Sequence, residues 1–160
     1  MTATTITGLG YEDIAVGQTA EFSRQLTEEL VELFAAVSGD LNPVHLDAEF
    51  AASTPFGERI GHGAWVSSVI SAAIAMQLPG PGAIYRSQQI RFKEPVKMGD
   101  TVTVLLEVTE KKDRMRLLML DCKVTNQHGK LVAQGIAEVI APGEAQTVVK
   151  PECPAFNKVN

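Results

Sequence analysis

The sequence is poor in cysteine, and this scarcity excludes several kinds of protein. Only Cys122 and Cys153 occur among 160 residues, and they form no C-x-x-C pair. Two cysteines neither build a disulfide framework nor supply the Cys/His spacing of a structural zinc site. We expect two free thiols in a reducing compartment, with Cys122 packed in the core as a small hydrophobic residue.

Positive charge is also scarce over the chain as a whole. The formal net charge is −5 at pH 7, whereas a nucleic-acid-binding protein normally presents a basic face to phosphates. We therefore expect no nucleic-acid partner. The charge is unevenly divided, since residues 1–60 hold ten acidic and two basic side chains, while residues 61–160 hold nine and twelve. An anionic ligand is expected to meet the second part of the chain.

Motifs that bind common cofactors are absent. The sequence contains neither the P-loop pattern G-x-x-x-x-G-K-[ST] nor the glycine fingerprint of dinucleotide-binding folds. Ser67, Ser68 and Ser71 lie outside a nucleophile elbow. We expect neither a metal ion nor a redox cofactor. The first residues, MTATTITGLG, lack the basic and apolar regions of a signal peptide, so a cytoplasmic location is expected.

Charged side chains are missing from one long internal stretch, residues 60–85. Glycine and His62 open this stretch, and Pro79-Gly80-Pro81-Gly82 closes it, so fewer than about 20 continuous apolar residues remain to cross a membrane. The stretch instead predicts a helix of about 15 residues that is apolar on nearly all sides. Such a helix belongs in the middle of a core, wrapped by other elements.

The elements that wrap this helix are predicted to be strands. Segments rich in Val, Ile, Leu and Thr, separated by turn signals, predict consecutive antiparallel strands at 83–93, 101–110, 115–126 and 131–141. A second helix is predicted at 28–38, between an N-cap at Thr27 and a terminator at Gly39.

The fold class predicted from these elements is α+β, with one antiparallel sheet curled around one buried helix. The length fits a single domain, which we place at residues 1–142. Residues 143–160 lose periodicity and are predicted to be a C-terminal tail, for which a partner subunit is a candidate packing surface.

A stiff loop after the 28–38 helix carries the first group of chemically active side chains. In SGDLNPVH (38–45), Pro43 fixes its own φ and moves Asn42 out of the α region. Such a bend can aim Asp40 and His45 at one point, where a carboxylate and an imidazole can hold and deprotonate a water. Spacing alone favours the commoner roles, with Asp40 capping a helix and His45 a satisfied polar residue.

Two further segments bear on binding. Gly61-His62-Gly63 opens the buried helix, where unpaired N–H groups and the helix dipole can stabilise an oxyanion, or where small residues simply allow close packing. His62 is more often structural than a ligand or an acid in such a place. A basic cluster can attract the phosphates of a nucleotide-like carrier, or can guard a solvated strand edge; it comprises Arg86, Arg91, Lys93 and Lys97.

Three segments together resemble the MaoC-like enoyl-CoA hydratases, and more narrowly the stand-alone (R)-specific type. They are FAAVSGDLNPVHLDAEFAAST (34–54), RIGHGAWVSSVIS (59–71) and LPGPGAIYRSQQIRFKEPVKMGD (78–100). The resemblance runs from about residue 10 to 142. It implies the hot-dog fold, a curled antiparallel sheet around a long central helix. It also implies a homodimer joined edge to edge, an acyl-CoA thioester substrate, and no cofactor, because coenzyme A is part of the substrate.

The resemblance also implies roles for individual residues. Asp40 and His45 match the catalytic pair of the SGD-x-NP-x-H motif, and Gly63 matches the glycine whose backbone N–H binds the thioester oxygen. Ser71 matches a serine that lines the site, and Ile74 falls where an acyl-pocket residue is expected.

Other positions are supportive by resemblance or depart from the family pattern. Asn42 shapes the catalytic loop, and His62 matches a histidine that supports the site. Gly61 replaces the usual alanine, and Trp65 places a bulky ring just past the oxyanion glycine, where it bears on acyl-chain specificity. The coenzyme A phosphates are expected to meet Arg86, Arg91 and Lys93.

The implied function is hydration of a trans-2-enoyl-CoA to an (R)-3-hydroxyacyl-CoA by a water that Asp40 and His45 activate. One alternative is the reverse reaction on a 3-hydroxyacyl carrier protein, because the same residues run it. Another is a non-catalytic acyl-CoA-binding subunit, although a binder needs neither member of the pair. A thioesterase would need its acid or base at other positions.

Overall fold

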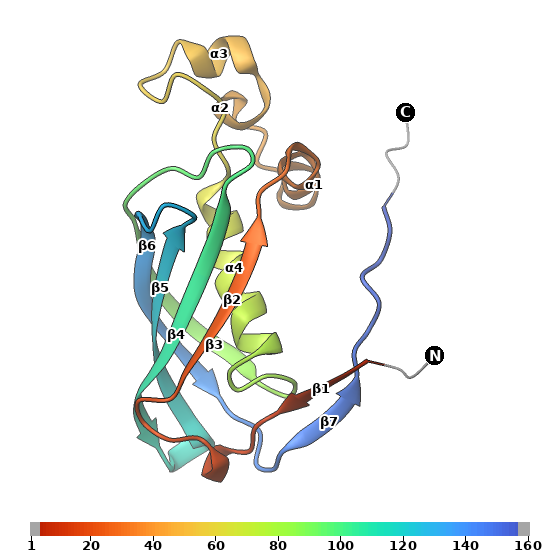
Figure 1. Ribbon diagram of the computed structural model, residues 1–160, viewed down its shortest axis with the longest axis vertical. Helices are drawn as coiled ribbons and strands as arrows, with labels where there is room; N and C mark the ends of the chain where they lie inside the picture. The colour runs from red at the N-terminus through yellow and green to blue at the C-terminus, as the bar shows by residue number, and fades with distance from the viewer. Residues whose placement is uncertain (1–3, 157–160) are drawn as a thin grey trace.

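The computed structural model describes residues 4–156 and shows a curved antiparallel sheet packed on the long helix α4 (Gly63–Met76) (Figure 1). The strand order is β2-β4-β5-β6-β3. The strands are β2 (Thr19–Gln25), β3 (Ile84–Phe92), β4 (Thr101–Lys112), β5 (Leu117–Asn126) and β6 (Leu131–Ile140). This is the predicted α+β class in the hot-dog arrangement that the resemblance implied.

The four predicted strands are confirmed to within two residues at each end, but their expected pairing is only partly right. β4, β5 and β6 form consecutive hairpins, whereas β3 pairs with β6 and lies at the edge of the sheet. The opposite edge, β2, was not predicted. In its sequence TAEFSRQ only Ala20 and Phe22 pack against the core, so the apolar alternation is too short to stand out.

The core lies between α4 and the inner face of the sheet. Alternate residues of β4 and β5 are buried, as the period of a strand requires. Cys122 is fully buried among them, which confirms its predicted place, and burial raises the pKa of its thiol to about 12. The buried residues of α4 are Trp65, Val66, Val69, Ile70, Ala73 and Ile74.

The expectation that α4 is covered on all sides is wrong for one face. Ala64, Ser68 and Ala75 are exposed and recur at helical spacing, so they share one side of the helix. The sheet curls around the remainder and leaves this stripe of small residues open. The absence of charge predicted burial, but small residues also suit close approach of another surface.

Short elements complete the two ends of the molecule. At the end where α4 begins lie α1 (Glu28–Ser38), α2 (Pro43–Leu46) and α3 (Ala48–Ala52) (Figure 1). At the other end β1 (Thr5–Gly8) pairs with β7 (Gln146–Val149), with the short 3-10 helices Tyr11–Asp13 and Arg114–Arg116 nearby.

β7 lies inside the segment predicted to be a tail, where no strand was expected. Its partner β1 is about 140 residues away in the sequence, so no local pattern announces the pairing. The domain boundary at residue 142 stays a prediction. No helix in residues 4–156 is long and apolar enough to cross a membrane.

Candidate functional site

The loop that carries Asp40 begins where α1 ends. The N-cap of α1 is Thr27, as predicted, and its Oγ1 accepts a hydrogen bond from the Leu30 N–H at 3.2 Å. Gly39 follows the helix in the left-handed region, at φ 76°, which favours glycine. Ser38 Oγ then accepts from the Asp40 N–H at 3.2 Å. The chain therefore turns sharply at the end of α1 and places Asp40 in the loop before α2.

Asn42 shapes the loop between the two candidate catalytic residues. Its N–H donates to Asp40 Oδ1 at 3.2 Å, and its own side-chain oxygen accepts from the Val44 N–H at 3.3 Å as the N-cap of α2. With Asp40 Oδ1 occupied in this way, Oδ2 is the carboxylate oxygen left for chemistry. Asn42, and not Asp40, is therefore the N-cap of α2, and Asp40 uses Oδ1 only to hold the loop.

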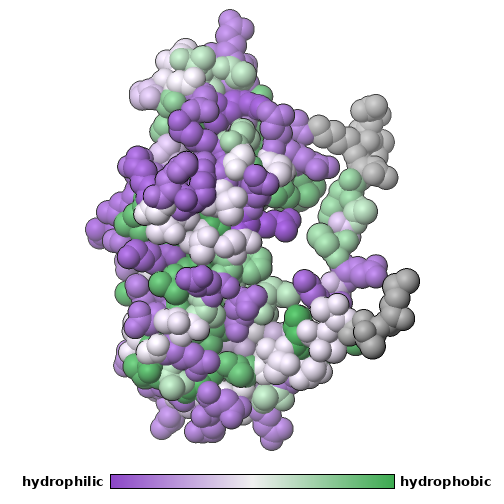
Figure 2. All heavy atoms as spheres, viewed as in Figure 1, coloured by the Kyte–Doolittle hydropathy of each residue, from purple (hydrophilic) through white to green (hydrophobic). Residues whose placement is uncertain are grey.

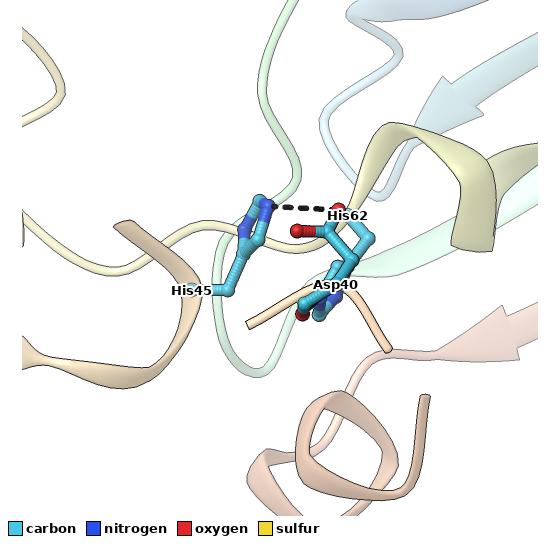
Figure 3. Close-up of side chains that lie close together, drawn as sticks. All are labelled: Asp40, His45 and His62. Atoms are coloured by element: carbon cyan, nitrogen blue, oxygen red, sulfur yellow. Dashed lines mark hydrogen bonds and ion pairs between the residues drawn. The ribbon is translucent and has the colours of Figure 1, made fainter. Parts of the chain in front are cut away.

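Asp40 and His45 face one another across a short gap (Figure 3). Asp40 Oδ2 lies 3.9 Å from His45 Nε2, with side-chain exposures of 49% and 10%. The other ring nitrogen, Nδ1, lies 2.8 Å from the carbonyl oxygen of Ile60. Because a carbonyl only accepts, Nδ1 carries the N–H and Nε2 presents its lone pair.

The gap suits a water molecule better than a direct hydrogen bond. A separation of 3.9 Å exceeds hydrogen-bonding distance. With His45 neutral, both facing atoms are acceptors, and a water can donate one hydrogen to each. The arrangement can hold a water and take a proton from it.

His62 touches both members of the pair. It is almost fully buried, at 1% exposure, and its Nε2 lies 3.1 Å from the main-chain oxygen of Asp40. Its ring stacks on that of His45, with centroids 3.9 Å apart and planes tilted by 31°. Phe34 of α1 packs at 5.0 Å from the same ring. Sequence reasoning gave His62 a supportive role but not these contacts, because Asp40 and His62 lie 22 positions apart.

Asp40, His45 and His62 offer ligand atoms within 4.8 Å of one another, which is close enough for one metal ion to be considered. An imidazole lone pair lies in the plane of its ring, and a metal ion must lie near that plane. His45 Nδ1 and His62 Nε2 each face a backbone carbonyl, and the two rings pack against one another with planes tilted by 31°. The geometry suits proton transfer better than metal binding.

The start of α4 supplies a candidate oxyanion site. Gly63 is the first residue of the helix, and within residues 4–156 its backbone N–H has no hydrogen-bond acceptor. A Cβ on Gly63 would lie 3.2 Å from the Phe92 ring. A Cβ on Gly61 would lie 2.5 Å from a Leu26 methyl group. Both glycines therefore lie in close contact with neighbouring side chains, while the Gly63 N–H stays available.

A cavity of about 290 Å³ lies at this helix start. Lys93 and Phe92 lie on its wall beside Gly63. The full lining is Phe56, Ile60, Gly61, His62, Gly63, Val66, Phe92, Lys93, Glu94, Pro95 and Val96.

The predicted acyl-binding residues lie further along α4. Ser71 and Ile74 are about 12 and 16 Å from Gly63 at the rise of an α-helix, and Ile74 is buried in the core. Trp65 does not line the Gly63 cavity. It lines a separate apolar cavity of about 360 Å³ with Phe34 and residues of β2.

The predicted phosphate-binding residues divide into near and far groups. Lys93 lines the Gly63 cavity, just after the last residue of β3. Arg91 is exposed on β3. Arg86 is 3.8 Å from Glu138 and is therefore partly neutralised. Lys97 pairs with Glu58. The structure thus brings one of these basic side chains to the cavity.

Known proteins resemble this chain both in sequence and in fold. The model of the MaoC like domain matches residues 13–128. The chain is similar to an (R)-specific enoyl-CoA hydratase of Rhodospirillum rubrum, with 40% identity over 132 residues, 82% of this chain and 91% of the relative. It is 45% identical over 114 residues to a 3-hydroxybutyryl-CoA dehydratase of Methylorubrum extorquens, covering 71% and 73%. The unliganded R-hydratase PhaJ1 from Pseudomonas aeruginosa superimposes with a TM-score of 0.92 and 47% identity over 98% of this chain and all of that one.

Proposed function

Because the chain belongs to the MaoC-like domain family, we propose that it is a hydro-lyase that adds water to a trans-2-enoyl-CoA and forms an (R)-3-hydroxyacyl-CoA. Relatives named for this chemistry are 40–47% identical to it over the aligned residues. The observation that carries the proposal is the 3.9 Å gap between Asp40 Oδ2 and His45 Nε2. The gap provides two acceptors for one water.

The proposed reaction begins with a water between Asp40 and His45. Asp40 Oδ2 acts as the general base, and the water oxygen bonds to C3 of the enoyl group. The electrons of the C2–C3 double bond move toward the thioester carbonyl. The proton that Asp40 Oδ2 takes from the water passes to His45 Nε2, the more buried of the two groups, and from there to C2, where the enolate electrons form the new C–H bond. One water is added, and the pair returns to its starting state.

The enolate charge of this reaction is assigned to the N-terminus of α4. The Gly63 N–H is free within the described chain, and the helix dipole adds partial positive charge there. Donors fixed in advance where charge develops lower the barrier because they need no reorganisation. The His62 side chain does not cap the helix, so the first N–H groups remain available.

The other candidate substrate-binding residues are ranked by their position relative to the Gly63 cavity. Lys93 is the first candidate for the coenzyme A phosphates because it lines the Gly63 cavity. Arg91 comes next along β3, and Arg86 ranks last because Glu138 lies beside it. The acyl chain is assigned to the direction of Ser71 and Ile74. Trp65 is assigned an influence on acyl-chain specificity through the separate cavity that it shares with Phe34.

We propose that the protein forms a homodimer. The edge strand β3 exposes Ile84 and Phe92 by 60% and 51%, and α4 exposes its small-residue face. A second copy that joins at this edge would cover both. Figure 2 shows the C-terminal segment standing away from the body across a hollow, which is lined by α1 and residues 153–156 and which a partner can fill.

No cofactor is assigned to the proposed reaction, because adding water to a double bond transfers no electrons to or from the protein. Coenzyme A enters as part of the substrate. A cytoplasmic location is proposed because both thiols are free, at Cys122 and Cys153. The reverse reaction on an acyl carrier protein uses the same residues, so only the carrier distinguishes it.

The test is the loss of enoyl-thioester absorbance when the purified protein meets crotonyl-CoA or octenoyl-CoA. Fast loss with an (R)-3-hydroxyacyl-CoA product supports the proposal. If only thioesters of the acyl carrier protein react, the protein is instead a dehydratase that acts on 3-hydroxyacyl carrier protein. Tight binding of every thioester without turnover would make it a binding subunit.

A further inference from the structure

We propose that His62 is a positioning residue for the proposed hydration, acting through Asp40 and His45 and not by touching the substrate. The inference rests on the proposed function and assigns a role to a side chain that the reaction itself leaves unused. It starts from the two contacts that His62 makes, one with the main chain of Asp40 and one with the ring of His45.

The first contact fixes the loop that carries the carboxylate. His62 Nε2 is 3.1 Å from the Asp40 carbonyl oxygen, and because a carbonyl only accepts, Nε2 must carry the N–H. His62 is also the N-cap of α4, so its main chain leads directly into Gly63. One residue therefore ties the exposed Asp40 loop to the helix start that is assigned the thioester oxygen.

The second contact fixes the direction of the imidazole. The ring of His45 has one hydrogen bond, from Nδ1 to Ile60, and a single bond leaves the ring free to tilt. The His62 ring lies against its face at 3.9 Å and blocks that tilt. His45 Nε2 therefore stays aimed at Asp40 Oδ2. A displacement of about 1 Å at a reacting group can cost about 10²-fold in rate.

The tautomer of His62 is consistent with this role. Its Nδ1 is buried and has no hydrogen-bond partner among residues 4–156. A proton on Nδ1 would be buried without an acceptor, next to the ring that receives a proton in the reaction. The contacts therefore place a proton on Nε2, which faces the Asp40 carbonyl, and give none of the described residues as an acceptor for Nδ1. The competing role is that Nδ1 accepts a hydrogen bond from the substrate or the attacking water.

Three variants separate the two contacts. His62→Gln keeps an N–H donor but no ring, His62→Phe keeps a ring but no donor, and His62→Ala removes both. We expect His62→Ala to lower kcat by about 10²-fold with little change in KM, and the other two to fall between it and the wild type. A rise in KM at constant kcat would overturn the proposal, because it would indicate contact with the substrate.

A double-variant cycle tests whether His62 acts through its neighbour. If it does, His45→Ala and the double variant His45→Ala/His62→Gln, in which glutamine keeps an N–H donor for the Asp40 carbonyl, have nearly the same kcat, since there is no longer a ring to position. If the two losses multiply, His62 acts on the substrate or water itself and the proposal is wrong. Thermal unfolding of each variant shows whether a loss of folded protein contributes.

A spectroscopic measurement decides the same question without turnover. The chain has three histidines, His45, His62 and His128, so their imidazole ¹⁵N signals can be assigned by substitution. We expect Nδ1–H for His45 and Nε2–H for His62, and a mixture of tautomers for His45 in His62→Ala. A proton on Nδ1 of His62, or an unchanged His45 in the Ala variant, would overturn the proposal. Failure of the wild type to hydrate any enoyl-CoA would refute only the proposed function.

Discussion

Replacing Asp40 by asparagine removes the proposed general base while leaving the loop intact. The side chain is 49% exposed, and the asparagine amide oxygen can keep the hydrogen bond that Oδ1 accepts from the Asn42 N–H. The free energy of unfolding is therefore expected to change little. The NH₂ group, however, takes the place of Oδ2 and donates toward His45 Nε2. The gap then holds a donor facing an acceptor, and the water loses one of its two acceptors.

The expected loss follows from what is removed. A general acid–base group contributes about 10²–10⁴-fold in rate. At about 1.4 kcal/mol per tenfold, this corresponds to about 3–5 kcal/mol of transition-state stabilisation. The geometry favours the upper part of this range, because the carboxylate both holds the water and takes its proton. KM should stay near the wild-type value, since no substrate contact is assigned to Asp40.

The assay is steady-state hydration of crotonyl-CoA, with thermal unfolding measured on the same samples. Asp47→Asn is the matched control, because Asp47 is the N-cap of α3 and accepts from the Glu49 and Phe50 N–H groups. Asparagine caps helices about as well as aspartate does, so stability and kcat should both persist. If Asp40→Asn kept more than a tenth of the wild-type kcat while fully folded, the assignment of the general base would be wrong.

Three further predictions follow from the same structure. Gly63→Ala places a Cβ 3.2 Å from the Phe92 ring, and the resulting shift of the N–H should lower kcat by about 10²-fold; an unchanged kcat in a folded variant would exclude this oxyanion site. Lys93→Ala should raise KM for acyl-CoA and weaken its dependence on salt, whereas Arg86→Ala, the control already paired with Glu138, should change KM less; equal effects would contradict the ranking. Burial raises the pKa of Cys122 from 9.0 to about 12, so a thiol reagent at pH 8 should label Cys153 alone until the protein is unfolded. The unfolded thiol ionises first, so the free energy of unfolding should fall as the pH rises above about 9; labelling of two thiols in the native protein would contradict the buried position.

The elements that could be predicted are those with local signals. Thr27 and Gly39 mark the two ends of α1, and the uncharged stretch 60–85 contains α4. The strands β3 to β6 were predicted because their apolar residues alternate between strong turn signals. β2 escaped prediction because it has two core-facing apolar residues, and β7 because its partner lies at the other end of the chain.

The candidate site also combines features that have a local sequence signal with features that have none. The sequence alone predicted a stiff bend between Asp40 and His45, because Gly39, Asn42 and Pro43 constrain the backbone within a few residues. It left open whether the two side chains face one another, which the structure shows. The resemblance, carried by the same motif, named the chemistry. Both sources placed Gly63 at the start of a helix, where unpaired N–H groups follow from helix geometry itself.

Only the tertiary structure decided how these groups are held. It placed the Ile60 carbonyl on His45 Nδ1, stacked His62 on His45, and brought Lys93, but not Arg86, to the cavity. It also left one face of α4 uncovered, where the sequence predicted full burial. These contacts join residues 15 or more positions apart or lie on different elements. Backbone preferences act over a few residues, whereas packing selects among all surfaces that the folded chain brings together, so these contacts could not be derived from the sequence.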